Sequence, residues 1–257
     1  MRQSNKVIVV MPAYNAEKTL KLTYERLPKD CVDLVILVDD SSTDETVQIA
    51  KELGLKIFLH SKNYGYGANQ KTCYTEALKE QSGIVVMLHP DYQYDPALLP
   101  QLIEPIERGV ADIVLGSRFL VDDALKRGMP WWKYIANRFL TKIENIVLHQ
   151  TLSEYHTGYR AYSRRFLESV PFILNSDKFV FDQEILAQAV HNGFRIAEIP
   201  VPAKYFPDAS SAGFFDSLFY GFSILFLLFK YILDTSGIIR QKQFQSLVSR
   251  YKAMEFE

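Results

Sequence analysis

The chain has 257 residues, a length suited to one large α/β domain with a full core, or to one domain with a small extension. Its 29 Lys and Arg residues are balanced by 30 Asp and Glu residues, which argues against the strong basic field of a nucleic-acid-binding protein. The two cysteines, Cys31 and Cys73, lie in apolar surroundings and a strand pattern begins at once without a signal region, so we expect two buried thiols in a cytoplasmic protein.

The first half of the sequence alternates between strand and helix patterns. Apolar runs rich in β-branched residues predict strands at 6–11, 34–38, 56–60, 84–88 and 112–115. Helices are predicted between them, from residue 16, over 43–53, over 68–79 and after residue 95. This alternation predicts an α/β fold with a Rossmann-like, mainly parallel sheet, right-handed crossovers and helices on both faces.

Local signals predict where these helices start and end. Asn15 is placed to cap the first helix, and Ser42 has capping-box spacing from Glu45 at the second. Gly54 follows the second helix as a C′ residue would. Asp95, followed by proline, predicts the start of the fourth helix.

The regular alternation stops after Arg118. The second half predicts a loop at 121–130, a helix at 131–149, a short strand region at 151–163, a helix at 178–191, strands at 194–199 and 201–205, and a loop at 207–213. We assign residues 1–210 to one α/β domain, and residues 211–257 to an aromatic helix with a polar tail.

The predicted helix at 214–233 is rich in phenylalanine. Its uncharged stretch, 218–229, is shorter than the roughly 20 residues that a membrane-spanning helix needs. Apolar residues recur at a spacing of three to four, which suits a helix lying at a membrane surface: Phe214, Phe215, Leu218, Phe219, Phe222, Leu225, Phe226 and Phe229. A helix that packs within the protein, or in a homo-oligomer, stays open.

Polar motifs follow three of the predicted strands. Their sequences are Pro-Ala-Tyr-Asn-Ala-Glu at 12–17, Val-Asp-Asp-Ser-Ser at 38–42 and His-Pro-Asp-Tyr-Gln at 89–93. Ligands of open α/β sheets bind at these strand ends. The first strand–helix turn lacks glycines, which argues against a dinucleotide oxidoreductase. The glycines at 65 and 67 instead predict a tight turn with backbone close to a ligand. Carboxylates in such motifs suggest a nucleotide-sugar site that holds a metal ion.

The acids of these motifs have distinct chemical options. Asp39 and Asp40 are able to accept hydrogen bonds from a base or ribose, to approach a metal, or to cap the next helix. Asp91 is the best candidate ligand for a divalent cation, because a hard cation on a diphosphate takes one or two carboxylates plus phosphate oxygens. Gln93 is placed to reach a hydroxyl or phosphate. His89 suits a metal softer than magnesium, a phosphate contact or a structural role.

Basic residues follow the fifth predicted strand. Arg118, in Gly-Ser-Arg, would lie at the same sheet edge as Asp91 and suits bidentate phosphate capture. Nearby residues of the next helix are able to extend an anion site, namely Lys133, Asn137 and Arg138. More polar groups follow, and their spacing alone assigns no role to them: Glu154, His156, Arg160, Asp182 and Glu184.

Together these motifs resemble the family 2 glycosyltransferases, which have the GT-A fold. The resemblance is carried by Pro-Ala-Tyr-Asn-x-Glu, Val-Asp-Asp-Ser-Ser-x-Asp, x-x-Asp-x-Gln and Gly-Ser-Arg, in that order, and covers roughly residues 6–210. It is strongest to the dolichyl-phosphate mannosyltransferase and polyprenyl-phosphate glucosyltransferase branch, to which segments 154–161 and 194–200 are also similar. Residues 1–210 are thereby identified as a GT-A catalytic domain.

The resemblance implies a role for each motif. The nucleotide would be bound by Pro12, Tyr14, Glu17, Asp39 and Asp40, the metal and diphosphate by Asp91, Gln93 and His89, and the acceptor phosphate by Arg118, Lys133 and Asn137. Asp91 and Arg118 would be the catalytic residues, with Mg²⁺ or Mn²⁺ as cofactor. Two positions depart from the family: His89 stands where the first acid of Asp-x-Asp is usual, and Lys133 where an arginine is usual.

The implied activity is inverting transfer of a hexose from a UDP- or GDP-linked sugar to a polyprenyl phosphate, by a protein peripheral to the inner face of the membrane. A lipid phosphate is already ionised and needs no general base. A sugar or polysaccharide hydroxyl acceptor would need one, for which Asp182 and Glu184 are candidates. A non-catalytic domain that binds a nucleotide sugar is a third alternative.

Overall fold

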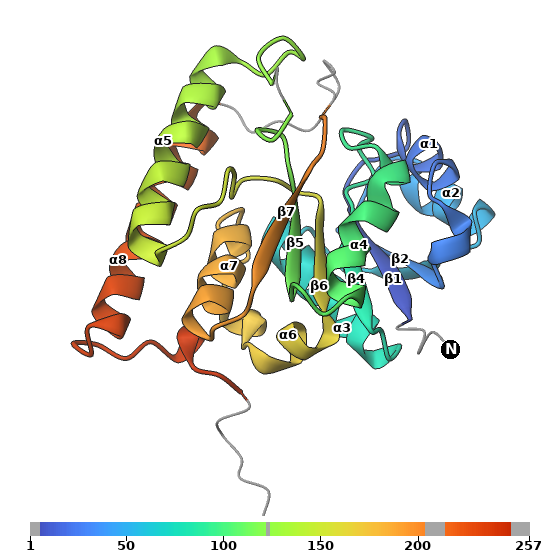
Figure 1. Ribbon diagram of the computed structural model, residues 1–257. Helices are drawn as coiled ribbons and strands as arrows, with labels where there is room; N and C mark the ends of the chain where they lie inside the picture. The colour runs from blue at the N-terminus through green and yellow to red at the C-terminus, as the bar shows by residue number, and fades with distance from the viewer. Residues whose placement is uncertain (1–5, 122–123, 204–213, 248–257) are drawn as a thin grey trace, which may run out of the picture.

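The computed structural model describes residues 6–121, 124–203 and 214–247, with the side chains of 214–216 excepted. A seven-stranded sheet with the order β3-β2-β1-β4-β6-β5-β7 lies at its centre (Figure 1). The strands are β1 (Val7–Ala13), β2 (Leu34–Asp39), β3 (Lys56–Leu59), β4 (Ile84–Met87), β5 (Ile113–Ser117), β6 (Arg160–Ser163) and β7 (Ile196–Pro200). The five strands predicted in the first half of the chain are therefore confirmed, with small shifts of their ends.

All neighbouring strands pair in parallel except β6, which runs antiparallel to β4 and to β5. The predicted, mainly parallel sheet is thus confirmed. Arg160, the first residue of β6, pairs with Met87 of β4 and with Leu115 of β5, close to the carboxyl ends of both. The antiparallel direction therefore brings the segment before β6 to the edge of the sheet where the polar motifs lie.

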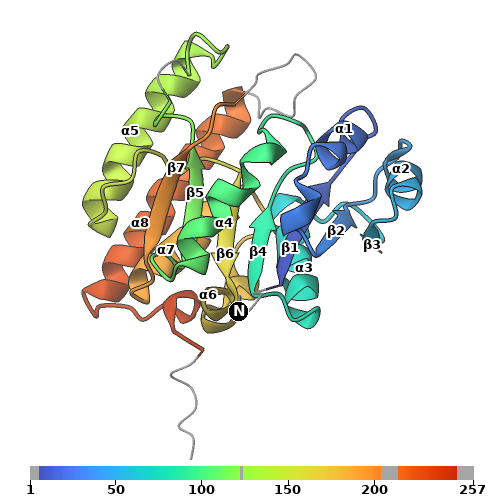
Figure 2. The ribbon, with the colours of Figure 1, turned by 45° about the vertical axis from the view of Figure 1, so that its right-hand side comes forward.

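Helices cover both faces of the sheet (Figures 1 and 2). They are α1 (Leu20–Glu25), α2 (Thr46–Glu52), α3 (Tyr66–Lys79), α4 (Leu99–Glu107), α5 (Trp131–Leu148), α6 (Arg164–Ser169), α7 (Phe181–His191) and α8 (Phe214–Thr235). Alternate residues of β1 point to opposite faces. Val9 packs with the buried side chains of α1, α2 and α4, whereas Val10 packs with those of α3, α6, α7 and α8.

The predicted helix starts are only partly correct. Helix α1 begins at Leu20 rather than at residue 16, and Asn15 does not cap it, because its side chain accepts a hydrogen bond from the backbone N–H of Thr43. The capping box at Ser42 does not form either. Helix α2 begins at Thr46, and the backbone N–H of Glu45, which the box would have bonded to Ser42, donates to Glu17 at 3.1 Å.

Two other capping predictions are confirmed. Gly54 has a φ of +69°, as a C′ glycine should. Asp95 accepts a hydrogen bond from Ala97 and caps a short 3₁₀ turn, η2 (Pro96–Leu98), which leads into α4. Both cysteines are free thiols, as expected. Cys73 is buried as predicted, whereas Cys31 is only partly buried.

The second half of the chain departs from its prediction in two places. The region at 151–163 forms a strand only from Arg160, and α6 follows it unpredicted. The strand predicted at 201–205 is absent from its described part, 201–203, where Ala203 forms a single isolated bridge with Tyr94. The loop predicted at 207–213 lies outside the described residues.

Helix α8 has one buried and one exposed side. Ile224, Leu227, Leu228 and Tyr231 are buried in the core that α7 also enters. The apolar stretch is longer than the sequence indicated: Ser217–Thr235 is, by length and composition, able to cross a membrane, and it is the one such helix among the described residues. Because its buried side packs against the domain, α8 lies along the protein surface beside α5 (Figures 1 and 2).

Candidate active site

The three polar motifs lie at one edge of the sheet. β1 pairs in parallel with both β2 and β4, so the carboxyl ends of these strands face the same way. The ends of β2 and β4 are separated by two strand spacings, or about 10 Å. The sheet order thus brings the segments carrying Asp39 and Asp91 to a common edge, as the sequence predicted.

The loops that follow β1 and β2 are joined by hydrogen bonds. The backbone N–H of Asn15 donates to the Ser42 hydroxyl at 2.8 Å, and Glu17 accepts from the backbone N–H of Glu45 at 3.1 Å. Pro12 is buried within β1, whereas Tyr14 is 54% exposed at the rim. The two loops are therefore joined into one unit, with Tyr14 exposed at its rim.

The adjacent acids Asp39 and Asp40 have different surroundings. Asp40 accepts hydrogen bonds from the backbone N–H groups of Tyr64 and Gly65, both at 2.9 Å, and contacts His60 at 2.7 Å. Asp39 uses one carboxylate oxygen to accept from the Ser42 N–H. Its other oxygen, Oδ1, is buried and has no hydrogen-bond partner among the described residues. A buried carboxylate oxygen without a hydrogen-bond partner destabilises the fold. Asp39 is therefore suited to accept a hydrogen bond from an N–H or O–H group of a ligand.

The 89–93 motif forms a tight, polar turn. The Asp91 carboxylate accepts from the backbone N–H of Gln93 at 3.0 Å, and Tyr92 adopts a left-handed backbone conformation with a φ of +57°. Asp91 and Gln93 are both partly exposed. The described residues contain no cluster of three His, Cys, Asp or Glu side chains able to hold a metal. A cation at Asp91 would therefore need further ligands from a bound molecule, as phosphate oxygens provide for Mg²⁺.

His89 belongs to a network that the sequence did not indicate. Its Nε2 lies 3.1 Å from the hydroxyl of Tyr66, which donates to Asp182 at 2.7 Å. The His89 and Tyr66 rings are stacked with their centroids 5.4 Å apart. Desolvation lowers the pKa of His89, and the charge of Asp91 opposes that shift in part.

The glycines at 65 and 67 serve this network rather than a ligand. A Cβ on Gly67 would lie 2.3 Å from the carbonyl oxygen of Ser176, and one on Gly65 would lie 2.8 Å from that of Asp177. The close approach predicted from these glycines is therefore to the 176–178 segment of the chain itself. This packing places Tyr66 at the first turn of α3, facing α7.

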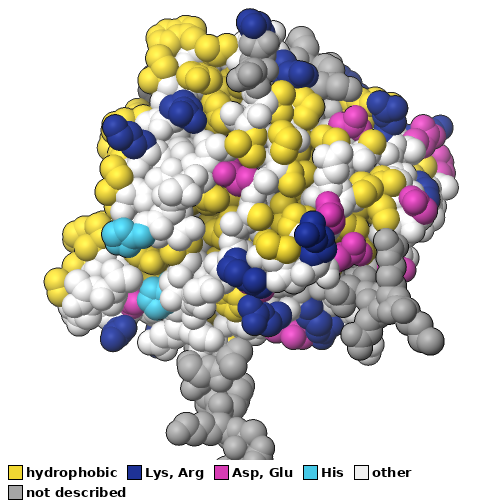
Figure 3. Space-filling model, viewed as in Figure 1, with side chains coloured by type: hydrophobic (Ala, Val, Ile, Leu, Met, Phe, Trp, Pro, Cys, Tyr) yellow, Lys and Arg dark blue, Asp and Glu magenta, His cyan; other side chains and the backbone are white. Residues whose placement is uncertain are grey.

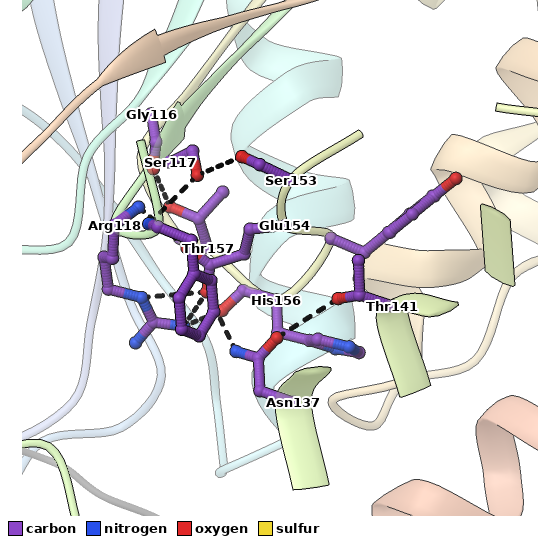
Figure 4. Close-up of polar contacts among 12 residues, drawn as sticks. Gly116, Ser117, Arg118, Asn137, Thr141, Ser153, Glu154, His156 and Thr157 are labelled. Carbon is purple, nitrogen blue, oxygen red and sulfur yellow. Dashed lines mark hydrogen bonds and ion pairs between the residues drawn. The ribbon is translucent and has the colours of Figure 1, made fainter. Parts of the chain in front are cut away.

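Arg118 is bound to a buried acid (Figure 4). Its backbone N–H and its Nε donate to Glu154 at 2.8 and 2.9 Å, and its Nη2 contacts Glu154 and the carbonyl oxygen of His156. Asn137 donates to the same carboxylate at 2.9 Å. Glu154 has no exposed surface. Burial raises the pKa of Glu154, but Arg118 and the hydrogen bonds outweigh burial and leave it below its usual value.

The three residues predicted to receive an acceptor phosphate are thus brought together. Arg118 and Asn137 share Glu154, and Lys133 lies one turn before Asn137 on α5. Burial lowers the pKa of Lys133, and the nearby charge of Arg118 lowers it further. The sequence named Glu154 without assigning it a role, because nothing local shows that it faces Arg118.

Of the two candidate bases, only Asp182 joins the site. Asp182 binds Tyr66, which contacts His89. Glu184 faces elsewhere, since it accepts from the backbone N–H of Ser176 at 2.5 Å and lies 3.6 Å from Lys230.

Comparison with known proteins identifies the family of this chain. The model of the family described as glycosyl transferase family 2 matches residues 8–170. The polyprenol monophosphomannose synthase of Mycolicibacterium smegmatis is 26% identical over 78% of this chain and 78% of its own length. The UDP-N-acetylglucosamine–dolichyl-phosphate N-acetylglucosaminyltransferase of Methanococcus voltae is 27% identical over 86% of this chain and 94% of its own length.

A solved structure shares the fold. Glucosyl-3-phosphoglycerate synthase of Mycobacterium tuberculosis, in complex with Mn²⁺, UDP-glucose and phosphoglyceric acid, superposes with a TM-score of 0.65 at 19% identity, covering 88% of this chain and 79% of that one. The sheet order and this superposition confirm the GT-A fold. Since the family model spans more than half of its length, the chain belongs to glycosyl transferase family 2 and is a glycosyltransferase.

Proposed function

We propose that this glycosyltransferase moves a hexose from a UDP- or GDP-linked sugar to a polyprenyl phosphate, with inversion of the anomeric centre. The names of the two relatives support a lipid phosphate as acceptor. The observation that carries the proposal is the position of Lys133. It lies near Arg118 at the start of α5, a helix whose outward side chains Trp131 and Ile135 are apolar and 70% and 58% exposed. A phosphate and its hydrocarbon tail would therefore meet the same helix.

The nucleotide is proposed to lie against the loops after β1 and β2. The unpartnered oxygen of Asp39 would accept from the base or the ribose, and the exposed ring of Tyr14 would flank them beside Pro12. Asp40 and Glu17 would act by shaping the neighbouring loops, because their carboxylates bind backbone N–H groups there.

This assignment predicts the effect of Asp39→Asn. The amide would present either an N–H or a weaker acceptor to the ligand, and a hydrogen bond to a charged group contributes about 1.5–3 kcal/mol. We expect UDP or GDP affinity, measured by titration calorimetry, to fall at least about tenfold without loss of thermal stability. Asp30→Asn, at an exposed acid in η1 (Lys29–Cys31), is the control. Unchanged affinity in Asp39→Asn would contradict the assignment.

The residues at 89–93 fit a divalent cation. Asp91 would hold Mg²⁺ or Mn²⁺, with Gln93 and His89 beside it, and the diphosphate would complete the coordination sphere. When bound, the cation would act as a Lewis acid and neutralise charge on the leaving diphosphate.

The protein's own groups would position the acceptor. Arg118, Lys133 and Asn137 would hold the acceptor phosphate so that one of its oxygens attacks the anomeric carbon from the face opposite the diphosphate. The new carbon–oxygen bond forms as the bond to the diphosphate breaks, and the electron pair leaves with the diphosphate. The transition state would resemble an oxocarbenium ion, as in glycoside hydrolysis. Glu154 would keep the Arg118 guanidinium oriented.

A transfer assay with matched acceptors tests the proposal. UDP- and GDP-hexoses would be offered with Mn²⁺ or Mg²⁺ to a polyprenyl phosphate, to the same polyprenol without phosphate, to phosphoglyceric acid and to a free sugar. We expect product only with the polyprenyl phosphate. Product with phosphoglyceric acid or the free sugar instead would overturn the lipid assignment, and nucleotide-sugar binding without any product would indicate a non-catalytic domain.

A hydroxyl acceptor is the second candidate. It is favoured by one observation, the carboxylate of Asp182 within the His89 network, where a general base could act. The free-sugar arm of the same assay distinguishes this candidate.

A membrane-facing surface is also proposed. The outward sides of α5 and α8 carry apolar side chains that are each 55–70% exposed, namely Trp131, Ile135, Phe139, Ile146, Phe219, Phe222, Phe226 and Phe229. We call these eight residues the apolar face. Arg138 and Lys142 of α5 are exposed beside it, and Figure 3 shows basic side chains among the hydrophobic ones over α5. Apolar area with flanking cations suits peripheral binding to an anionic, cytoplasm-facing membrane.

The apolar face predicts how the protein partitions to vesicles. Replacing Phe219, Phe222 and Phe226 together with serine should lower co-flotation with phosphatidylglycerol-containing vesicles at least tenfold, because each buried phenylalanine contributes about 1.5–3 kcal/mol. The melting temperature should stay unchanged, since these side chains are exposed. Full-length variants are needed, because removing α8 would also remove core residues.

The matched control replaces three exposed apolar residues elsewhere with serine, Leu59, Val110 and Ile173. Equal flotation of both triple variants would show that α8 is not a membrane contact.

A further inference from the structure

The hydrogen bonds around Tyr66 fix the position of a proton. The Tyr66 hydroxyl has one proton and two polar neighbours, Asp182 at 2.7 Å and His89 Nε2 at 3.1 Å. The Asp182 carboxylate meets donors only: Gln70 Nε2 lies 3.0 Å from Oδ1, and Arg160 lies 3.7 Å from Oδ2. Asp182 is therefore the acceptor, and the proton of Tyr66 is directed to it.

This arrangement sets the tautomer of His89. Because Tyr66 donates to Asp182, its oxygen can only accept from His89, so the imidazole proton lies on Nε2. With that proton on Nε2, the ring nitrogen left to face a ligand is Nδ1. Among the described residues, Nδ1 of His89 has no hydrogen-bond partner.

The ring is also held in place by packing. The Tyr66 ring stacks on the His89 ring, and Phe179 lies behind Tyr66 with a centroid separation of 4.6 Å. Gly158 lies against the edge of the imidazole, where an added Cβ would be 2.9 Å from Cδ2. The orientation of the lone pair is thus set by the fold before any ligand binds.

The lone pair decides which ligand His89 suits. A phosphate oxygen is itself an acceptor, so it gains nothing from an unprotonated nitrogen. A metal ion, in contrast, is bound by an unprotonated nitrogen. A metal-binding histidine usually donates its other ring N–H to a partner that holds the ring in place. Tyr66 is such a partner, and the Asp182 carboxylate holds Tyr66 in turn. Asp91 lies two residues from His89 along the chain.

We propose that His89 supplies a nitrogen ligand to the cation at Asp91, that Tyr66 and Asp182 are positioning residues for this ligand, and that the site therefore prefers a transition-metal ion such as Mn²⁺ over Mg²⁺. Imidazole is a softer ligand than carboxylate and suits Mg²⁺ poorly, which gives the preference its direction. The inference rests on the proposed nucleotide-sugar site and specifies the metal chemistry of that site.

Pulsed EPR of Mn²⁺ bound to the full-length chain with UDP or GDP tests the ligand directly. We expect coupling to a nitrogen nucleus in the unmodified protein and its loss in His89→Asp, which restores an all-carboxylate site. The affinity ratio of Mn²⁺ to Mg²⁺, measured by competition with nucleotide present, should fall at least tenfold in His89→Asp. His149→Asn is the control, because His149 is exposed and its left-handed backbone also suits asparagine. Absence of nitrogen coupling, or an unchanged ratio, overturns the proposal.

Tyr66→Phe tests the positioning residues, since it keeps the ring stack and removes only the hydroxyl. We expect ¹⁵N NMR of the imidazole to show the Nε2–H tautomer of His89 in the unmodified protein and a mixture of tautomers in the variant. Loss of such a partner usually weakens metal binding about 10–100-fold, and we expect a loss of that size for Mn²⁺ with nucleotide. An Nδ1–H tautomer in the unmodified protein would refute the inference.

The two proposals fail in different ways. If neither UDP nor GDP binds in the presence of Mn²⁺, the proposed function and this inference both fall. If nucleotide and Mn²⁺ bind together without nitrogen coupling, only this inference falls.

Discussion

Asp91→Asn is expected to lower kcat/KM for hexose transfer by about 10²–10³-fold, the usual effect of removing one electrostatic group that acts on developing charge. Asparagine has nearly the same shape and keeps an oxygen to accept from the Gln93 N–H, so the turn at 91–93 should remain. What is lost is the negative charge that would hold the cation against the diphosphate. To separate loss of the fold from loss of the cation, three quantities are measured on one preparation: the melting temperature, Mn²⁺ binding with nucleotide, and the transfer rate.

Asp95→Asn is the matched control for this prediction. Asp95 lies four residues further on and caps η2 through the Ala97 N–H, a role that asparagine fills equally well. Its transfer rate should stay close to that of the unmodified chain. Turnover of Asp91→Asn within a fewfold of normal would remove Asp91 from the metal site.

Glu154→Ala is expected to destabilise the fold by about 3–5 kcal/mol, because breaking a buried ion pair leaves the remaining charge uncompensated. Glu154 has no exposed surface and binds the backbone and side chain of Arg118 together with Asn137. In its absence the Arg118 guanidinium would lose its orientation, so transfer should fall as well. Urea denaturation measures the first effect and transfer kinetics the second.

Two further variants test whether the buried ion pair is the cause of the destabilisation. Glu154→Gln keeps the volume and one acceptor, so it should destabilise less than Glu154→Ala. Glu104→Ala removes the partner of Arg108 at an exposed ion pair 3.3 Å apart, where little change is expected. Equal stability of Glu154→Ala and Glu104→Ala would show that the buried pair does not hold this part of the fold together.

The pH dependence of stability provides a further check on Glu154. Its pKa in the folded chain lies below the ordinary value of 4.5, so its contribution is present above pH 4.5 and is lost as the pH falls toward the folded pKa. The unmodified chain should therefore lose stability relative to Glu154→Gln in acid, and not the reverse.

The sequence by itself determined the alternation of strands and helices and the motifs at the strand ends. Runs such as 34–38 and 84–88 are local signals, because an apolar, β-branched stretch bounded by polar residues has few alternatives to a buried strand. Parallel strands place their carboxyl ends at one edge, so the pattern predicted that the 38–42 and 89–93 motifs share an edge. The strand order β2-β1-β4 then decided that they lie only two strands apart. The capping interactions of Asn15 and Ser42 were mispredicted, since each found a partner in the other's loop.

Only the tertiary structure decided which polar groups face one another. Arg118 binds Glu154 across 36 positions of sequence, and Tyr66 binds Asp182 across 116. These pairs exist because β6 runs antiparallel between β4 and β5 and because α7 packs beside α3, and neither arrangement is marked by any local periodicity. The same is true of α8, whose spacing of apolar residues shows an amphipathic helix but not which side is buried. Local periodicity is set by neighbours along the chain, whereas hydrogen-bond partners and buried faces are selected by elements that meet only after the sheet has formed.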